Sequence, residues 1–214
     1  FLLTAPIIPQ IPTSFSFSSQ AAEPVDKKAF LVYDLKNVLP SDVRPLTNDE
    51  KARVGEVLNR TFGLNVSAEL LGKRLNTSYG YIGQEQHLAR YPGDNIYNHP
   101  KIPSGDEGMA PGLGAWGYFS QSREKLTRSL EETVRWFAVV QTLYLPDWNK
   151  RARYLREWYK YRKVLIVNTD NGNAVVAAIA DSGPAAWTGK QFGGSPEVME
   201  YLGGPRYKKG AVVI

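Results

Sequence analysis

The chain has 214 residues, 43% hydrophobic and 22% charged, which is the composition of an ordinary globular protein and excludes wholesale disorder. Its 26 Lys and Arg residues against 21 Asp and Glu residues give a formal net charge of +5. This excess favours anionic partners such as wall polymers, lipid headgroups or nucleic acid. Cysteine is absent, which excludes disulfides, thiolate metal sites and cysteine nucleophiles. No apolar run approaches the roughly 20 residues of a membrane-spanning helix, so we expect no membrane span.

The chain begins with an apolar segment that contains three prolines. Phe1–Ile8 is apolar and Thr13–Ala22 combines small and aromatic residues, an order that resembles the second half of a secretion signal. Serine and phenylalanine alternate over Ser14–Ser18, which instead favours an arm that adds as a strand to a neighbour. Residues 1–28 are therefore either an extended arm, with self-association through Phe1–Ala22, or a processing remnant.

Residues 29–107 are predicted to be a helical and loop region. Ala29–Leu35 indicates a short strand, and Thr47 followed by acidic residues indicates a capped helix start. A second helix is predicted over Ser67–Leu75. We expect these elements to contribute to packing.

A long loop is predicted over Tyr79–Gly114, which is rich in Gly, Pro and Asn and contains both histidines. Such loops are often functional. His87 is a weak candidate for a catalytic histidine, because a lone loop histidine usually serves only in hydrogen bonding. With two histidines and no cysteine, we expect no metal site.

Beyond this loop we predict a strand at Ala115–Phe119, a short helix at Ser122–Glu132 and an apolar strand at Trp136–Leu145. Asp147–Tyr159 has aromatic and apolar residues at helical spacing and predicts an amphipathic helix. Its basic residues either contact an anionic polymer or form a solvated face: Arg151, Arg153 and Arg156.

The last part of the chain gives the clearest signals. Val164–Val167 and Ala174–Ala180 flank the dipeptide Asn171-Gly172, a pattern typical of a β-hairpin. Ser195, followed by Pro and Glu, predicts a helix that ends near residue 203. Gly210–Ile214 predicts a closing strand.

This order of elements resembles the double-psi β-barrel of the rare lipoprotein A family, which expansins and some cellulose-cleaving endoglucanases share. The residues that carry the resemblance are Val167–Gly172, Asp181-Ser182-Gly183-Pro184, Gly189-Lys190 and Ser195–Gly203, with Gly114–Phe119 similar to the family's first strand. The resemblance implies an α+β protein in which residues 108–214 form a six-stranded double-psi barrel with an inserted basic-aromatic helix.

The resemblance also implies a glycan groove. Asp181 matches the family's groove aspartate, whereas Gln141 stands where the family has a histidine and Ser182 where it has an arginine. The other groove candidates are Trp116, Trp187 and Lys190.

Asp181 has two interpretations. As a carboxylic acid with a raised pKa it could protonate a glycosidic oxygen, and lytic cleavage of the transglycosylase type needs only one such group. As a structural residue it would accept backbone N–H bonds and fix the turn before Gly-Pro.

We therefore expect an extracellular or cell-envelope protein of bacterial type that binds, and if active cleaves, peptidoglycan-type glycan without a cofactor. The alternative is a non-catalytic structural or assembly subunit of the cell surface. Nucleic-acid binding through the basic stretch is the least favoured hypothesis.

Overall fold

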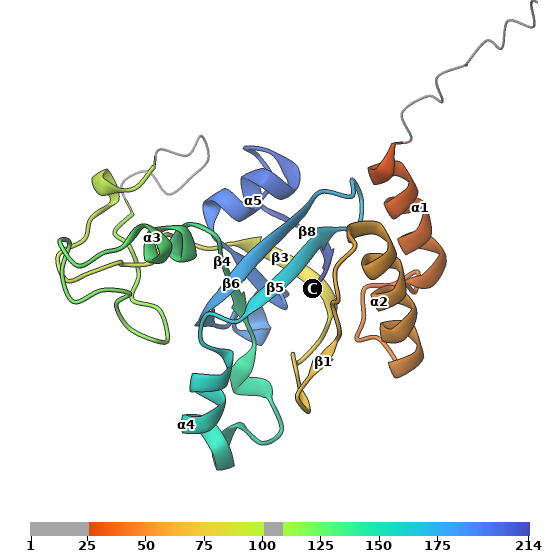
Figure 1. Cartoon of the computed structure of the whole chain (residues 1–214), viewed down its shortest axis with the longest axis horizontal. Helices are drawn as coiled ribbons and strands as arrows, with labels where there is room; N and C mark the ends of the chain where they lie inside the picture. Colours follow the sequence, from red (N-terminus) through yellow and green to blue (C-terminus); the bar gives the residue numbers. More distant parts are fainter. Residues whose placement is uncertain (1–25, 101–108) are drawn as a thin grey trace, which may run out of the picture.

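The structure, a computed structural model, describes residues 26–100 and 109–214 (Figure 1). The proposed Phe1–Ala22 arm lies outside the described residues. Within the described part, α-helices and a closed β-barrel form an α+β fold, as expected.

The centre of the fold is a closed barrel whose strands follow the order β3-β7-β4-β6-β5-β8. Strands β3 and β7 pair in parallel, as do β4 and β6, and every other neighbouring pair is antiparallel. This mixed six-stranded barrel is compatible with the double-psi type. The strands are β3 (Tyr79–Gln84), β4 (Phe137–Val140), β5 (Lys163–Asn168), β6 (Ala174–Ser182), β7 (Phe192–Gly194) and β8 (Lys209–Val213).

The predicted hairpin is confirmed by the pairing of β5 with β6. Gly172 in its turn has a φ of 71°, a conformation that glycine adopts without steric cost. Helix α5 (Pro196–Gly203) also forms as predicted, because the Ser195 hydroxyl accepts a hydrogen bond from the Val198 N–H. The closing strand β8 follows it.

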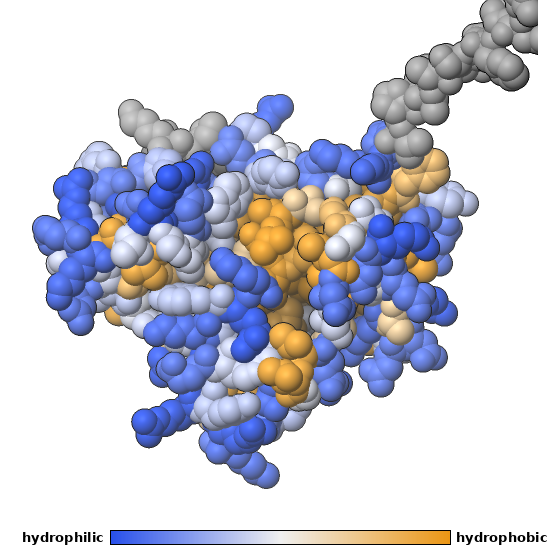
Figure 2. Space-filling view, viewed as in Figure 1, coloured by the Kyte–Doolittle hydropathy of each residue, from blue (hydrophilic) through white to orange (hydrophobic). Residues whose placement is uncertain are grey.

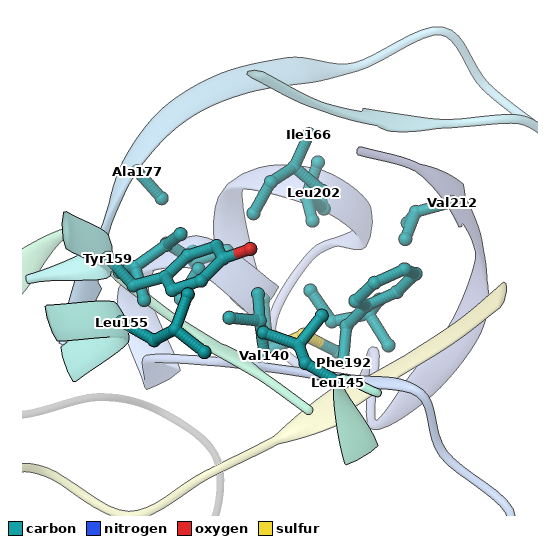
Figure 3. Close-up of a cluster of buried hydrophobic side chains, with 14 residues drawn as sticks. Val140, Leu145, Leu155, Tyr159, Ile166, Ala177, Phe192, Leu202 and Val212 are labelled. Carbon is teal, nitrogen blue, oxygen red and sulfur yellow. The ribbon is translucent and has the colours of Figure 1, made fainter. Parts of the chain in front are cut away.

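Apolar side chains from the strands and from two helices fill the barrel (Figure 3). Phe192, Val140 and Ile166 come from three strands, and Leu202 of α5 packs against them. Leu155 and other residues of helix α4 (Trp148–Tyr159) add to the same cluster. The predicted amphipathic helix is therefore part of the barrel core, and it bends at Arg151, where φ and ψ are not helical.

Two N-terminal helices, α1 (Lys27–Val38) and α2 (Asn48–Phe62), pack together beside the barrel (Figure 1). Thr47 caps α2 and, with Glu50, forms a capping box, as its sequence indicates. The strand predicted at Ala29–Leu35 is wrong, because this segment belongs to α1. Val167 and Val213 of the barrel share a buried cluster with both helices, so the helices are anchored to it.

The segment before the barrel also differs from expectation. Instead of a helix over Ser67–Leu75, the strands β1 (Glu69–Leu70) and β2 (Lys73–Arg74) form a small hairpin. Between them Leu71 and Gly72 both have positive φ values, which helical residues do not adopt. The expected loop from Tyr79 contains β3, so the first barrel strand lies upstream of residue 108.

Between β3 and β4 the chain is mostly irregular. The segment Ala115–Phe119 forms no strand, contrary to the prediction. Helix α3 (Arg128–Arg135) begins later than expected because Thr127, rather than Ser122, caps it. The predicted strand Trp136–Leu145 is confirmed only over β4, after which Thr142–Tyr144 forms a 3-10 helix, η2.

Among the described residues, no helix combines the length and apolar character that crossing a bilayer requires.

Candidate functional site

The candidate site lies where four barrel strands meet side by side. Gly193 of β7 pairs with Gly83 on one side and with Val139 on the other, and Val139 in turn pairs with Asp181. Glu85 directly follows β3, and its backbone N–H donates to the Gly194 carbonyl. This register brings Glu85 and Asp181, distant in sequence, to the same part of the barrel wall.

Asp181 is a partly buried carboxyl group held by backbone donors. Its Oδ1 accepts hydrogen bonds from the N–H groups of Ala115, at 2.7 Å, and Ser182, at 2.8 Å. Burial raises the pKa of Asp181 above its ordinary value, although these two hydrogen bonds oppose the increase. Both bonds end on Oδ1, so within the described part of the chain Oδ2 is left to accept or donate a proton elsewhere.

Glu85 is a second partly buried carboxyl group. Burial raises its pKa and the negative charge of Asp181 adds to the increase, whereas the Lys190 ammonium group, 3.1 Å away, favours the ionised form. A Cβ at Gly193 would lie 2.4 Å from the Glu85 Cγ, and one at Gly83 would lie 2.2 Å from the Lys190 Cδ. The two glycines therefore leave the space in which the ion pair lies across the strands.

The predicted aromatic groove residues have different surroundings. Trp187, in the 3-10 helix η3 (Ala186–Thr188), is 89% exposed and free to contact a ligand. Trp116 instead packs against the barrel core and donates its indole N–H to the Arg156 carbonyl oxygen. Only Trp187 therefore offers an open aromatic face.

Gln141 occupies the position where the family resemblance implies a histidine, and it is buried. Its amide nitrogen donates to the Pro184 and Lys190 carbonyls, while its amide oxygen accepts from Asn76. Gln141 thus links three segments and has its hydrogen-bonding groups engaged within the protein.

The Ser182 hydroxyl is likewise engaged, since it lies 2.5 Å from the hydroxyl of Thr142.

The three arginines of α4 do not act as one surface. Arg156 donates to the Ala115 carbonyl and so fastens the segment that also binds Asp181. Arg151 pairs with Asp147 and lies over the Tyr154 ring. Arg153 is exposed.

Both histidines belong to a buried polar cluster, which we define as Arg90, Asp94, His99, His87 and Glu197. His87 lies 3.3 Å from Glu197, its ring is 4.5 Å from that of His99, and His99 lies 2.9 Å from Asp94. His87 is only 2% exposed. The histidines therefore join the segment after β3 to α5. Over residues 26–100 and 109–214, no group of three or more His, Asp or Glu side chains is arranged to hold a metal ion.

Glu85 is the site residue that sequence reasoning did not select. The short pattern Gly83-Gln84-Glu85 does not by itself predict a functional site. Glu85 reaches the site only because β3 pairs with β7. A glycine facing each side chain of the ion pair, Gly83 and Gly193, is the only sequence feature consistent with this arrangement.

Comparisons with known proteins do not place the chain in a family. No family model matches it, and no curated protein matches it either.

Proposed function

We propose that this chain is a cell-envelope protein that binds and cleaves peptidoglycan-type glycan on the barrel surface around Asp181 and Glu85. The observation that carries the proposal is this pair of partly buried carboxyl groups, both with raised pKa values, on one stretch of barrel wall. Perturbed acids of this kind concentrate at catalytic sites. The resemblance of the Asp181–Pro184 motif to the rare lipoprotein A family supports the same chemistry.

In this proposal Asp181 is the general acid. Burial raises its pKa, which favours the protonated form, and in that form Oδ2 delivers the proton to the glycosidic oxygen as the bond to the anomeric carbon breaks. A hydroxyl of the same sugar then closes onto the anomeric carbon, so no water is consumed. Glu85, whose ionised form the Lys190 ammonium group favours, accepts the proton that this hydroxyl loses.

The surroundings supply contacts for a long anionic polymer. Trp187 presents an exposed ring on which a sugar can stack. Arg153 on α4 adds a positive charge for carboxylate or phosphate groups of the wall.

A second candidate function is a non-catalytic scaffold of the cell surface. The hydrogen bond from the Ala115 N–H to Asp181 favours it, because this bond fastens the long segment between β3 and β4 to the end of β6. In that function the aspartate is a turn-fixing residue.

One pair of variants separates the two functions. Asp181→Asn keeps the shape and can still accept both backbone bonds, but it has no transferable proton. For the enzyme we expect released muropeptides from purified wall glycan to fall to background, with glycan binding and melting temperature nearly unchanged. Asp170→Asn, an exposed change of the same chemistry in the hairpin turn, is the control and should keep full activity.

Glu85→Gln tests the second carboxyl group and should lower turnover with little effect on binding. If the unmutated protein releases no muropeptides and Asp181→Ala, which removes the acceptor of both backbone bonds, loses about 1–3 kcal/mol of stability, the scaffold function is the correct one.

A further inference from the structure

A groove of about 320 Å³ lies beside the barrel. It runs between α2, the β1–β2 hairpin, the end of α4 and the strands β5 and β8. The residues that line the groove include Ile179 of β6 but neither Glu85 nor Asp181, so the groove is distinct from the candidate glycan site. Figure 2 shows an apolar hollow on this face, between the barrel and the helical side.

The groove has an apolar interior. Val54 and Leu58 of α2, Trp158 of α4 and Leu165 of β5 contribute to its walls. Ser78 adds one polar group: its hydroxyl is buried and has no hydrogen-bond partner within the described part of the chain. An apolar cavity of this size with few polar groups is typical of a small-molecule site.

The charged side chains that line the groove all have the same sign. Five basic residues line it and no acidic residue does: Lys51, Lys73, Arg74, Arg162 and Lys163. Within residues 26–100 and 109–214, none of these five forms an ion pair. A ligand that neutralises them must be anionic, and a ligand that fills the interior must be apolar.

We propose that this groove binds a single-tailed anionic amphiphile, such as a medium-chain fatty acid. The tail occupies the apolar interior and the carboxylate faces the basic rim. The chain's own Phe1–Ala22 segment does not meet this requirement, because it contains no acidic residue.

Gly55 provides a test that does not damage the fold. It lies in the middle of α2 on the groove wall, and a Cβ there would meet only the Val66 carbonyl oxygen, at 3.9 Å. Gly55→Ala favours the helix and leaves the groove open. Gly55→Leu also favours the helix but places a large side chain in the groove. The two variants therefore differ in the groove and not in helix stability.

The binding of decanoate to the full chain is measured by isothermal titration calorimetry, with decyltrimethylammonium as the cationic probe of equal tail length. We expect saturable binding of decanoate and none of the cation. Gly55→Leu should weaken decanoate binding at least about tenfold, whereas Gly55→Ala should retain it. Lys163→Glu should weaken binding about threefold, an electrostatic loss that Lys150→Glu, outside the groove, should not cause.

Three results would overturn the proposal. The first is equal affinity for decanoate and the cation, which would show that charge plays no part. The second is identical decanoate binding by the two Gly55 variants, which would place the ligand elsewhere. The third is no decanoate binding together with binding to anionic phospholipid vesicles that Gly55→Leu leaves unchanged, which would indicate a membrane-surface contact instead.

Discussion

The buried carboxylate of Asp94 should be one of the most stabilising polar groups of the protein. It accepts hydrogen bonds from the backbone N–H, Nε and Nη2 of Arg90 and lies 2.9 Å from the His99 ring nitrogen. Its side chain is 0% exposed and that of Arg90 is 10% exposed. Removing one charge of such a pair leaves the other buried and uncompensated, which costs about 3–5 kcal/mol.

We expect Asp94→Asn to lower the free energy of unfolding by about 3 kcal/mol, the lower end of this range, because the amide oxygen still accepts some of the bonds. The melting temperature should fall by about 6–12 °C. Urea denaturation at pH 7, followed by tryptophan fluorescence, measures the change. Asp42→Asn, at an exposed site, is the matched control and should change stability by less than about 0.5 kcal/mol.

The pH dependence provides an independent check. Burial alone would raise the pKa of Asp94, but the bonds from Arg90 and His99 outweigh it and hold the pKa below its usual range. The unfolded-state pKa is about 3.9, so the stabilisation is complete above that pH and is lost as the pH falls further. The difference in the free energy of unfolding between the unmutated protein and Asp94→Asn should therefore decrease below about pH 4. If Asp94→Asn lowers the free energy of unfolding by less than about 1 kcal/mol at pH 7, this account of the cluster is refuted.

Three further changes test other parts of the structure. Gly172→Ala should destabilise the protein by about 1–2 kcal/mol more than Gly63→Ala in urea denaturation. Both glycines have positive φ, but only at Gly172 would a new Cβ lie close to a backbone atom, the Lys28 carbonyl oxygen at 2.9 Å. Burial raises the pKa of Glu85, so the unmutated protein should gain stability relative to Glu85→Gln as the pH falls from 7 to about 4. Melting temperatures measured over this pH range that change in the opposite direction would contradict this prediction. Trp187→Ala should weaken binding to wall glycan up to about tenfold without changing the melting temperature, whereas Tyr97→Ala, an equally exposed aromatic, should leave binding unchanged; equal effects would exclude a Trp187 platform.

Local signals predicted the elements whose conformation depends on neighbouring residues. The Asn171-Gly172 turn, the Ser195 cap and the Thr47 cap each act over a few residues, and each predicted its element correctly. Such signals are strong because the turn or cap is the same in any tertiary context.

Helix α1 was mistaken for a strand because Phe30 to Tyr33 are four consecutive apolar residues. In the structure Leu31 and Leu35, one turn apart, are buried against α2 and the barrel. Phe30 is 60% exposed and Tyr33 is 65% exposed. The burial pattern is helical, but the sequence conceals it because exposed aromatic residues fill the outer face.

Strand β3 was missed for a different reason. Gly80 and Gly83 weaken its local preference for a strand, and they are required only because the side chains of Gln191 and Lys190 lie against them. In the candidate site, too, the residue in a local sequence motif was predicted and the residue that depends on strand pairing was not. The motif around Asp181 identified one carboxyl group, whereas Glu85 depends on the position of β3 and could not be found from sequence alone.

The place of β3 in the barrel has a consequence for the kinetics of folding. Its strand partners are β7 and β8. Tyr79 pairs with Val213, although more than half of the chain lies between these two residues. Closing so long a loop costs chain entropy before any contact is gained, and proteins dominated by such pairings fold in about milliseconds to seconds. The β5–β6 hairpin can form early, whereas β3 stays an unpaired edge until the last strands arrive. The barrel wall that carries Glu85 should therefore be the last part to form, and its amide hydrogens should be among the last to gain protection during refolding.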